Sequence, residues 1–155
     1  MKVDAAIVTA ERWHIPHIVA HVRDADRAEF QAATMQTPEE VLEEAYVISH
    51  LAWTGLIDGV PVCMFGVVDS STVLTRQGRP WMVGTDLLEK HKMVFLRRCR
   101  ACLEIMKLCF GRLENCVDAR NTKAIQWLKW LGFSFGEPVP MGAFGLNFMR
   151  FSLEG

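Results

Sequence analysis

The chain has almost no net charge, one tyrosine and no long apolar run. Its 17 basic and 18 acidic side chains leave a net charge of −1, which gives no electrostatic reason to expect binding to nucleic acid or to an anionic membrane. No apolar stretch approaches the ~18 residues of a membrane-spanning helix, and no signal-peptide pattern opens the chain. We therefore expect a cytoplasmic domain without nucleic acid or membrane as a partner.

The cysteines do not form a disulfide framework. There are five, an odd number, at positions 63, 99, 102, 109 and 116, and in a chain without an export signal they are expected to be free, mostly buried thiols. Cys99 and Cys102 have the spacing of a redox pair, but this pair falls in the middle of a predicted helix. We interpret both as small core residues.

Half of the 155 residues are apolar, which is enough for one domain with a sizeable core. Hydrophobic periodicity predicts strands alternating with helices. Thr37 followed by Pro38 predicts a capped helix start, and Asp58-Gly59 predicts a hairpin. The expected strands are 3–9, 51–57, 60–68, 80–85, 113–118, 133–135 and 146–153, the expected helices are 14–22, 24–33, 38–50, 86–110 and 122–131, and the expected loops include 76–80 and 136–145.

Residues 121–133 give the most specific signal. Asn121 suits a helix N-cap, an apolar stripe follows, and Gly132 suits the left-handed position after the helix. The wording N-x-x-A-I-x-x-x-x-x-L-G-F resembles the last conserved segment of the GCN5-related N-acetyltransferase (GNAT) superfamily, and the order of elements is also that of this fold. The resemblance implies a single-domain α/β fold over residues 1–155, with a mixed sheet of about seven strands flanked by helices.

The resemblance also implies a place for acetyl-CoA. Family members carry a pyrophosphate cradle, Q/R-x-x-G-x-G/A, between the fourth strand and the long helix. Here that junction holds a single glycine, and Asp86 and Glu89 bring negative charge close to it. Asp86 can also be read simply as a helix cap, and Asn121 either as a contact to the pantetheine arm or as a cap alone. The expected cofactor-binding residues are Val83, Gly84, Thr85 and Asn121.

The usual catalytic groups are harder to find. Many family members place a tyrosine seven residues after the asparagine to protonate the leaving thiolate, whereas this chain has Leu128 there and its only tyrosine at Tyr46. The catalytic residues are therefore unknown from sequence. An apolar slot is expected between the fourth and fifth strands, edged by Trp81, Val83, Val117 and Ala119, and candidates for a general base are Glu11, Glu29, Glu43, Asp58 and Asp69.

A narrower resemblance rests on four separate segments, residues 81–85, 95–100, 117–121 and 127–133. Together they look like a phage or prophage family related to phage internal virion protein A, itself GNAT-like. This resemblance implies a phage or host protein as partner and a place in the host cytoplasm or the virion.

Two further patterns have ordinary explanations. His14, His17 and His21 lie on one helical stripe, but Pro16 lies among them and no fourth ligand is evident, so surface or cap roles are expected and no metal. Trp127 and Trp130 cannot both face one narrow core line. At least one of the two should therefore be partly exposed. Such a tryptophan is either an interface anchor or an ordinary residue at the edge of the core.

Two functions remain. The sequence favours a phage or prophage protein on a GNAT scaffold that has lost its catalytic groups and acts in virion assembly or on a host target. The alternative is a divergent acyl-CoA-dependent N-acetyltransferase that acetylates an amine. The acceptor, the partner and the formation of a homo-oligomer are left open.

Overall fold

The apolar runs of the sequence form one sheet covered by helices. The computed structural model describes residues 2–155. In chain order its elements are β1 (Ala5–Thr9), α1 (His14–Ala20), α2 (Asp24–Thr34), α3 (Pro38–Ile48), β2 (Ser49–Ile57), β3 (Val60–Asp69), β4 (Gln77–Gly84), α4 (Asp86–Lys90), α5 (Lys92–Cys109), β5 (Arg112–Asp118), α6 (Thr122–Leu131), β6 (Ser134–Phe135), β7 (Val139–Met141) and β8 (Leu146–Glu154).

The strands lie in the order β1-β2-β3-β4-β5-β8-β6, with β7 paired to β8. Successive residues of a strand point to opposite faces, and β3 therefore contributes to two cores. Phe65 packs with α5 and α6 in the larger one, whereas its neighbour Met64 packs with α1 and α3 in the smaller one. The mixed α/β architecture predicted from the sequence is confirmed.

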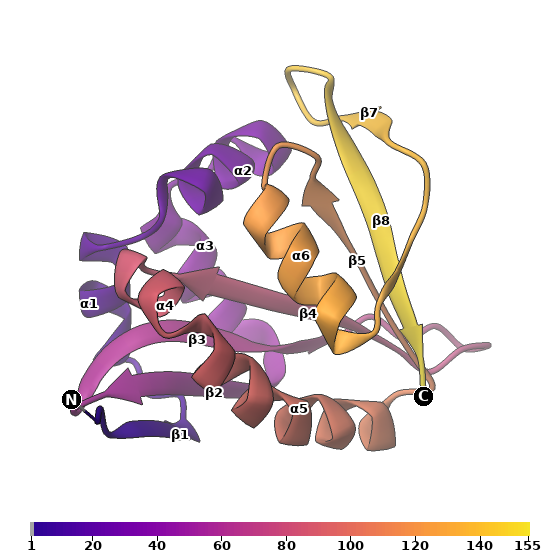
Figure 1. Cartoon of the computed structure of the whole chain (residues 1–155). Helices are drawn as coiled ribbons and strands as arrows, with labels where there is room; N and C mark the ends of the chain where they lie inside the picture. The colour runs from indigo at the N-terminus through magenta and orange to yellow at the C-terminus, as the bar shows by residue number, and fades with distance from the viewer. Residues whose placement is uncertain (1) are drawn as a thin grey trace.

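The sheet divides between β4 and β5, its only parallel pair within residues 2–155. The two strands pair only at Gln77↔Arg112 and Gly78↔Leu113 and then diverge (Figure 1). On the other side of the division, β5 pairs with β8 along its whole length. The expected opening between the fourth and fifth strands is therefore present.

Two helix boundaries form as their residues predict. The Thr37 side chain accepts a hydrogen bond from the Glu40 amide, and the Glu40 carboxylate accepts one from the Thr37 amide. This capping box satisfies two amides that the first turn of α3 would leave free. Gly132 ends α6 in the left-handed region, with φ at 103°.

Three predictions were wrong. Residues 77–80 are strand rather than loop, and Pro80 fits there because its missing N–H faces the opening instead of β3. Residues 139–141, expected in a loop, form β7 against β8. The expected long helix breaks at His91, because the backbone leaves the helical region there, with φ at −123°, and the His91 amide ends α4 by bonding to the Leu88 carbonyl. No helix in the described part of the chain is long and apolar enough to cross a membrane.

Replacing Gly132 by alanine tests the αL ending of α6. A Cβ at this position would come no closer than 4.0 Å to Leu153, so the penalty comes from the positive φ. We expect the free energy of unfolding in urea to fall by at least about 1 kcal/mol. Gly136→Ala is the matched control, since its φ is not positive and its nearest contact is 3.8 Å. Equal effects of the two changes would contradict the prediction.

Candidate functional site

The opening between β4 and β5 forms a cavity of about 820 Å³. Residues 79–84 of β4 form one wall and residues 115–117 of β5 the other. The cavity continues on both faces of the sheet, between α2 and α3 on one side and between α5 and α6 on the other. Ligands of α/β proteins bind where parallel strands part at their carboxyl ends, which is the position of this cavity.

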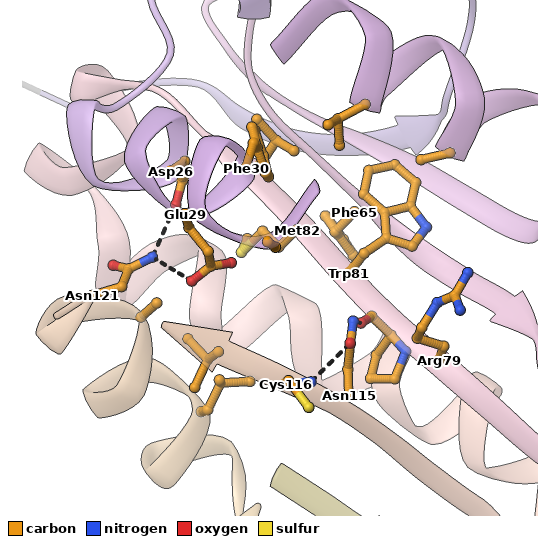
Figure 2. A pocket seen from close by; sticks show the side chains of 18 of the residues that line it. Asp26, Glu29, Phe30, Phe65, Arg79, Trp81, Met82, Asn115, Cys116 and Asn121 are labelled. Atoms are coloured by element: carbon orange, nitrogen blue, oxygen red, sulfur yellow. Dashed lines mark hydrogen bonds between the residues drawn. The ribbon is translucent and has the colours of Figure 1, made fainter. Parts of the chain in front are cut away.

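Four polar side chains meet at the wide end of the opening, and Figure 2 shows Asp26, Glu29 and Asn121 among them. Arg23 is 3% exposed and donates to Asp26 Oδ1 at 3.0 Å and to Asn121 Oδ1 at 3.3 Å. The Asn121 amide nitrogen donates in turn to Asp26 Oδ1 at 3.2 Å and to Glu29 Oε1 at 3.3 Å. This cluster, Arg23, Asp26, Glu29 and Asn121, is called the polar cluster below. It ties α2 to the start of α6.

Asn121 occupies the N-cap position of α6, as predicted, but the predicted capping bond of its side chain is wrong. The side chain makes no capping hydrogen bond, and the backbone lies at φ −82° and ψ 67°. Burial explains the missing bond, because Asn121 is 2% exposed and its side chain faces two carboxylates and a guanidinium that need partners. The side chain of Asn121 is therefore part of the cavity wall.

The other expected cofactor-binding residues differ in their access to the cavity. Val83 and Gly84 line it, but the Gly84 amide donates to Asp26 Oδ2 at 3.0 Å and is already occupied. Thr85 is buried, with its amide and its hydroxyl both bonded to the Val62 carbonyl, and it does not line the cavity. Binding of a cofactor by these residues stays a prediction.

The negative charge that Glu89 brings to the junction is balanced by two cationic side chains. Its carboxylate accepts from Arg23 Nε at 2.8 Å and from Lys123 Nζ at 2.7 Å, and the hydrogen bond from Lys123 lowers its pKa most. Glu89 thereby bridges α4 and α6 beside the polar cluster. Asp86 is exposed in the first turn of α4, and Thr85 occupies the N-cap position without a side-chain capping bond.

Of the five candidates for a general base, only Glu29 lines the cavity. The pKa of Glu29 is raised to about 7. Burial contributes most, the charges of Asp26 and Asp118 also raise the pKa, and hydrogen bonds from the Asp118 amide and Asn121 lower it in part. Its Oε1 accepts from the Asp118 amide at 2.9 Å. A carboxyl group with a pKa near neutrality is suited to taking and returning protons.

The wall formed by β4 offers free backbone groups, which the sequence interpretation did not single out. Gly84 turns its N–H and C=O away from β3, toward Asp26 and Arg23. Because the direction alternates along an antiparallel strand, Met82 also turns its N–H and C=O away from β3. The ladder with β5 ends at Gly78, so these groups of Met82 have no strand partner on the cavity side.

The remaining predictions around the cavity have mixed outcomes. Trp81, Val83 and Val117 line the cavity as expected, and Ala119 does not. Leu128 lines it, at the position where a tyrosine was looked for, whereas Tyr46 does not.

The two tryptophans of α6 differ in burial, as predicted. Trp127 is 6% exposed and lines the cavity. Trp130 is half-buried, and the Arg100 guanidinium lies 4.0 Å above its ring.

No histidine lines this cavity within the described residues. His14, expected at the surface or as a cap, is instead buried, and its Nδ1 lies 2.8 Å from the Thr54 hydroxyl. His17 and His21 are exposed. All five cysteines are free, and Cys99 and Cys116 contribute to the cavity wall.

The raised pKa of Glu29 predicts a pH dependence of stability. Between about 4.5 and 7 the folded chain keeps a proton that the unfolded chain releases, so raising the pH through this window lowers the free energy of unfolding. Glu29→Gln keeps an oxygen that can accept from the Asp118 amide and removes the titration. Urea unfolding between pH 5 and pH 8 should show the wild type losing stability relative to the variant. If the difference in free energy of unfolding between the wild type and the variant stayed the same from pH 5 to pH 8, the prediction would be contradicted.

No protein-family model and no curated protein sequence matches the chain. Solved structures do. A GNAT-family acetyltransferase from Streptococcus pneumoniae has a TM-score of 0.67 at 13% identity, covering 98% of this chain and 100% of that one. A ribosomal-protein-alanine N-acetyltransferase from Brucella melitensis has 0.71 at 14% identity, covering 97% and 99%.

A third structure, spermidine N-acetyltransferase from Vibrio cholerae in complex with CoA and spermine, has a TM-score of 0.69 at 14% identity, covering 97% of this chain and 95% of that one. These comparisons give the resemblance to phage internal virion protein A no support. The whole described chain has the fold of the GNAT acetyltransferases.

Proposed function

We propose that the chain transfers an acyl group from an acyl-CoA to an amine, with acetyl-CoA as the simplest donor. The observation that carries the proposal is the position of Glu29, a carboxyl group with a pKa of about 7 at the edge of the cavity between β4 and β5. Such a group can take a proton from an amine at neutral pH.

The reaction requires a free amine and an electrophilic carbonyl in the same cavity. Glu29 accepts a proton from the amine nitrogen as that nitrogen attacks the thioester carbonyl carbon. The C–N bond forms, the C–S bond breaks, and the products are an amide and a thiolate. The proton on Glu29 is then released to solvent or to the thiolate, which returns the carboxylate to its starting state.

The leucine at position 128 slows this reaction without preventing it. A tyrosine there would protonate the leaving thiolate, and losing such help costs ~10²–10⁴ in rate. An ordinary thiol has a pKa of about 8.5, so a thiolate is stable enough near neutral pH to leave without a dedicated acid.

Three groups are suited to the acyl-CoA. The free N–H and C=O of Met82 can pair with amides of a pantetheine arm, as an added strand would. Val83 and Asn121 flank the same stretch of cavity wall. At Gly84 the Asp26 carboxylate holds the amide, so a diphosphate would have to replace that hydrogen bond. Thr85 lies behind this wall and would support it without contact.

The test is release of free thiol from acetyl-CoA in the presence of a panel of primary amines, including a polyamine. Glu29→Gln should lower kcat/KM by about 10²–10⁴-fold, and the rise of the wild-type rate with pH near 7 should disappear. Glu39→Gln, at an exposed position of α3 outside the cavity, should leave the rate unchanged.

Binding of the donor is measured separately from turnover. Acetyl-CoA at ~100 times its dissociation constant should add ~2.7 kcal/mol to the free energy of unfolding, visible as a higher melting temperature. The absence of both thiol release and a melting shift at millimolar acetyl-CoA would contradict the proposal.

A second candidate is favoured by the occupied Gly84 amide and by Leu128. It is an interaction protein on the same scaffold, of phage or prophage origin, that binds a virion or host protein. Failure of both the turnover and the binding measurement would favour this candidate. Its direct check is copurification of a defined phage or host protein with the tagged chain.

A further inference from the structure

The two ends of the cavity differ in chemistry. The wide end carries the polar cluster, beside the carboxyl ends of β4 and β5. From there α6 runs from Asn121 toward Leu131, and the cavity narrows toward the point where Gly78 pairs with Leu113. The apolar side chains that line this narrow end on the α5–α6 face are Leu103, Met106, Leu131, Phe133 and Phe151. Asn115 also lines the cavity near its closed end, and its side-chain N–H is bonded to the Pro80 carbonyl.

The helices around this apolar end offer a single free hydrogen-bond donor within the described residues, the Trp127 indole N–H. After Asn121, the lining residues of α6 are Ala124, Trp127, Leu128 and Leu131, and those of α5 are Cys99, Leu103 and Met106. Only the Trp127 indole N–H is a strong donor among them, and it is a buried side-chain group without a partner in the described chain. An amide-bearing segment would lose its hydrogen bonds to water here and gain almost none.

The whole cavity has a volume of about 820 Å³, which the pantetheine arm and the acceptor amine share with the acyl group. An apolar space of about 150 Å³ is enough for six carbon atoms, because a dry cavity of that size holds benzene. An acetyl group adds two carbons to the thioester. The pantetheine amides would take the polar stretch along Met82, which leaves the apolar end unfilled.

We propose that the apolar end binds an aliphatic acyl chain of about eight or more carbons, so that a medium-chain or long-chain acyl thioester is the preferred donor. The inference rests on the proposed function and names the donor class for the same site. The thioester lies beside Glu29, and the chain extends along α6 toward Leu131. Met141, which lines the cavity and is 38% exposed, lies at its opening to solvent.

The first experiment measures thiol release with acyl-CoA donors of two, four, six, eight, ten and twelve carbons and one fixed amine. Burying one CH₂ group is worth about 0.8 kcal/mol, which is a factor of about four. We therefore expect kcat/KM to rise by up to about fourfold per added carbon until the cavity is filled. A rate that is highest with acetyl-CoA would overturn the inference and leave the proposed function standing.

The cavity is then narrowed by substitution. Ala124→Phe adds a ring to the α6 wall one turn after Asn121, where the proposed chain passes, and should reduce or remove the gain in kcat/KM with longer donors. Ala101→Phe is the matched control, on an exposed position of α5 outside the cavity, and should leave the preference unchanged. The same change in both variants, or in neither, would contradict the assigned position of the chain.

Two further measurements separate this inference from the proposed function. A series of n-alkylamine acceptors with acetyl-CoA shows whether the chain belongs to the amine, and a chain-length dependence found only there would overturn the inference. Melting with n-hexanol, n-octanol and n-decanol needs no turnover. Stabilisation that grows with chain length and is lost in Ala124→Phe, without any acyl transfer, would support the aliphatic site and overturn the transfer function.

Discussion

The ladder between β4 and β5 ends after two residue pairs, and the structure has to satisfy the backbone groups that this division leaves free. Helix α2 does much of this with carboxylates. Asp26 accepts from the Gly84 amide on one side of the division, and Glu29 accepts from the Asp118 amide on the other. Near the closed end, the Asn115 side chain donates to the Pro80 carbonyl at 2.8 Å. Side chains thus replace strand partners and hold the two halves of the sheet apart.

This arrangement also generates the chemical character of the cavity. Two carboxylates buried close together repel one another, and burial raises the pKa of both Asp26 and Glu29. Arg23 offsets part of the charge and lies 4.6 Å above the Trp127 ring. Glu29, with a pKa of about 7, can therefore exchange a proton near neutral pH. Its support of the β5 end and its raised pKa come from the same carboxyl group.

Local sequence signals predicted the parts of the fold that depend on neighbours in the chain. The capping box at Thr37 and the left-handed Gly132 are such cases. The fold and the opening followed from the resemblance carried by residues 121–133. The side-chain partners of Asn121 were not predicted, because Asp26 lies 95 positions away in the sequence. The break at His91 was not predicted either, because no proline or glycine there indicates the end of a helix. Glu29 was one of five equal candidates until the cavity was known.

Most of the hydrogen bonds that define the site join distant parts of the chain, the bond from Arg23 to Asp26 excepted. Arg23 to Asn121 spans 98 positions, and Glu29 to Asp118 spans 89. Contacts of such separation form late in folding, because the entropy of closing a long loop is lost before they are gained. The hairpins of β2, β3 and β4 can form earlier from local pairing. The cavity therefore exists only once the amino-terminal helices have docked on the carboxyl-terminal strands, and it is the first feature lost when these two regions separate.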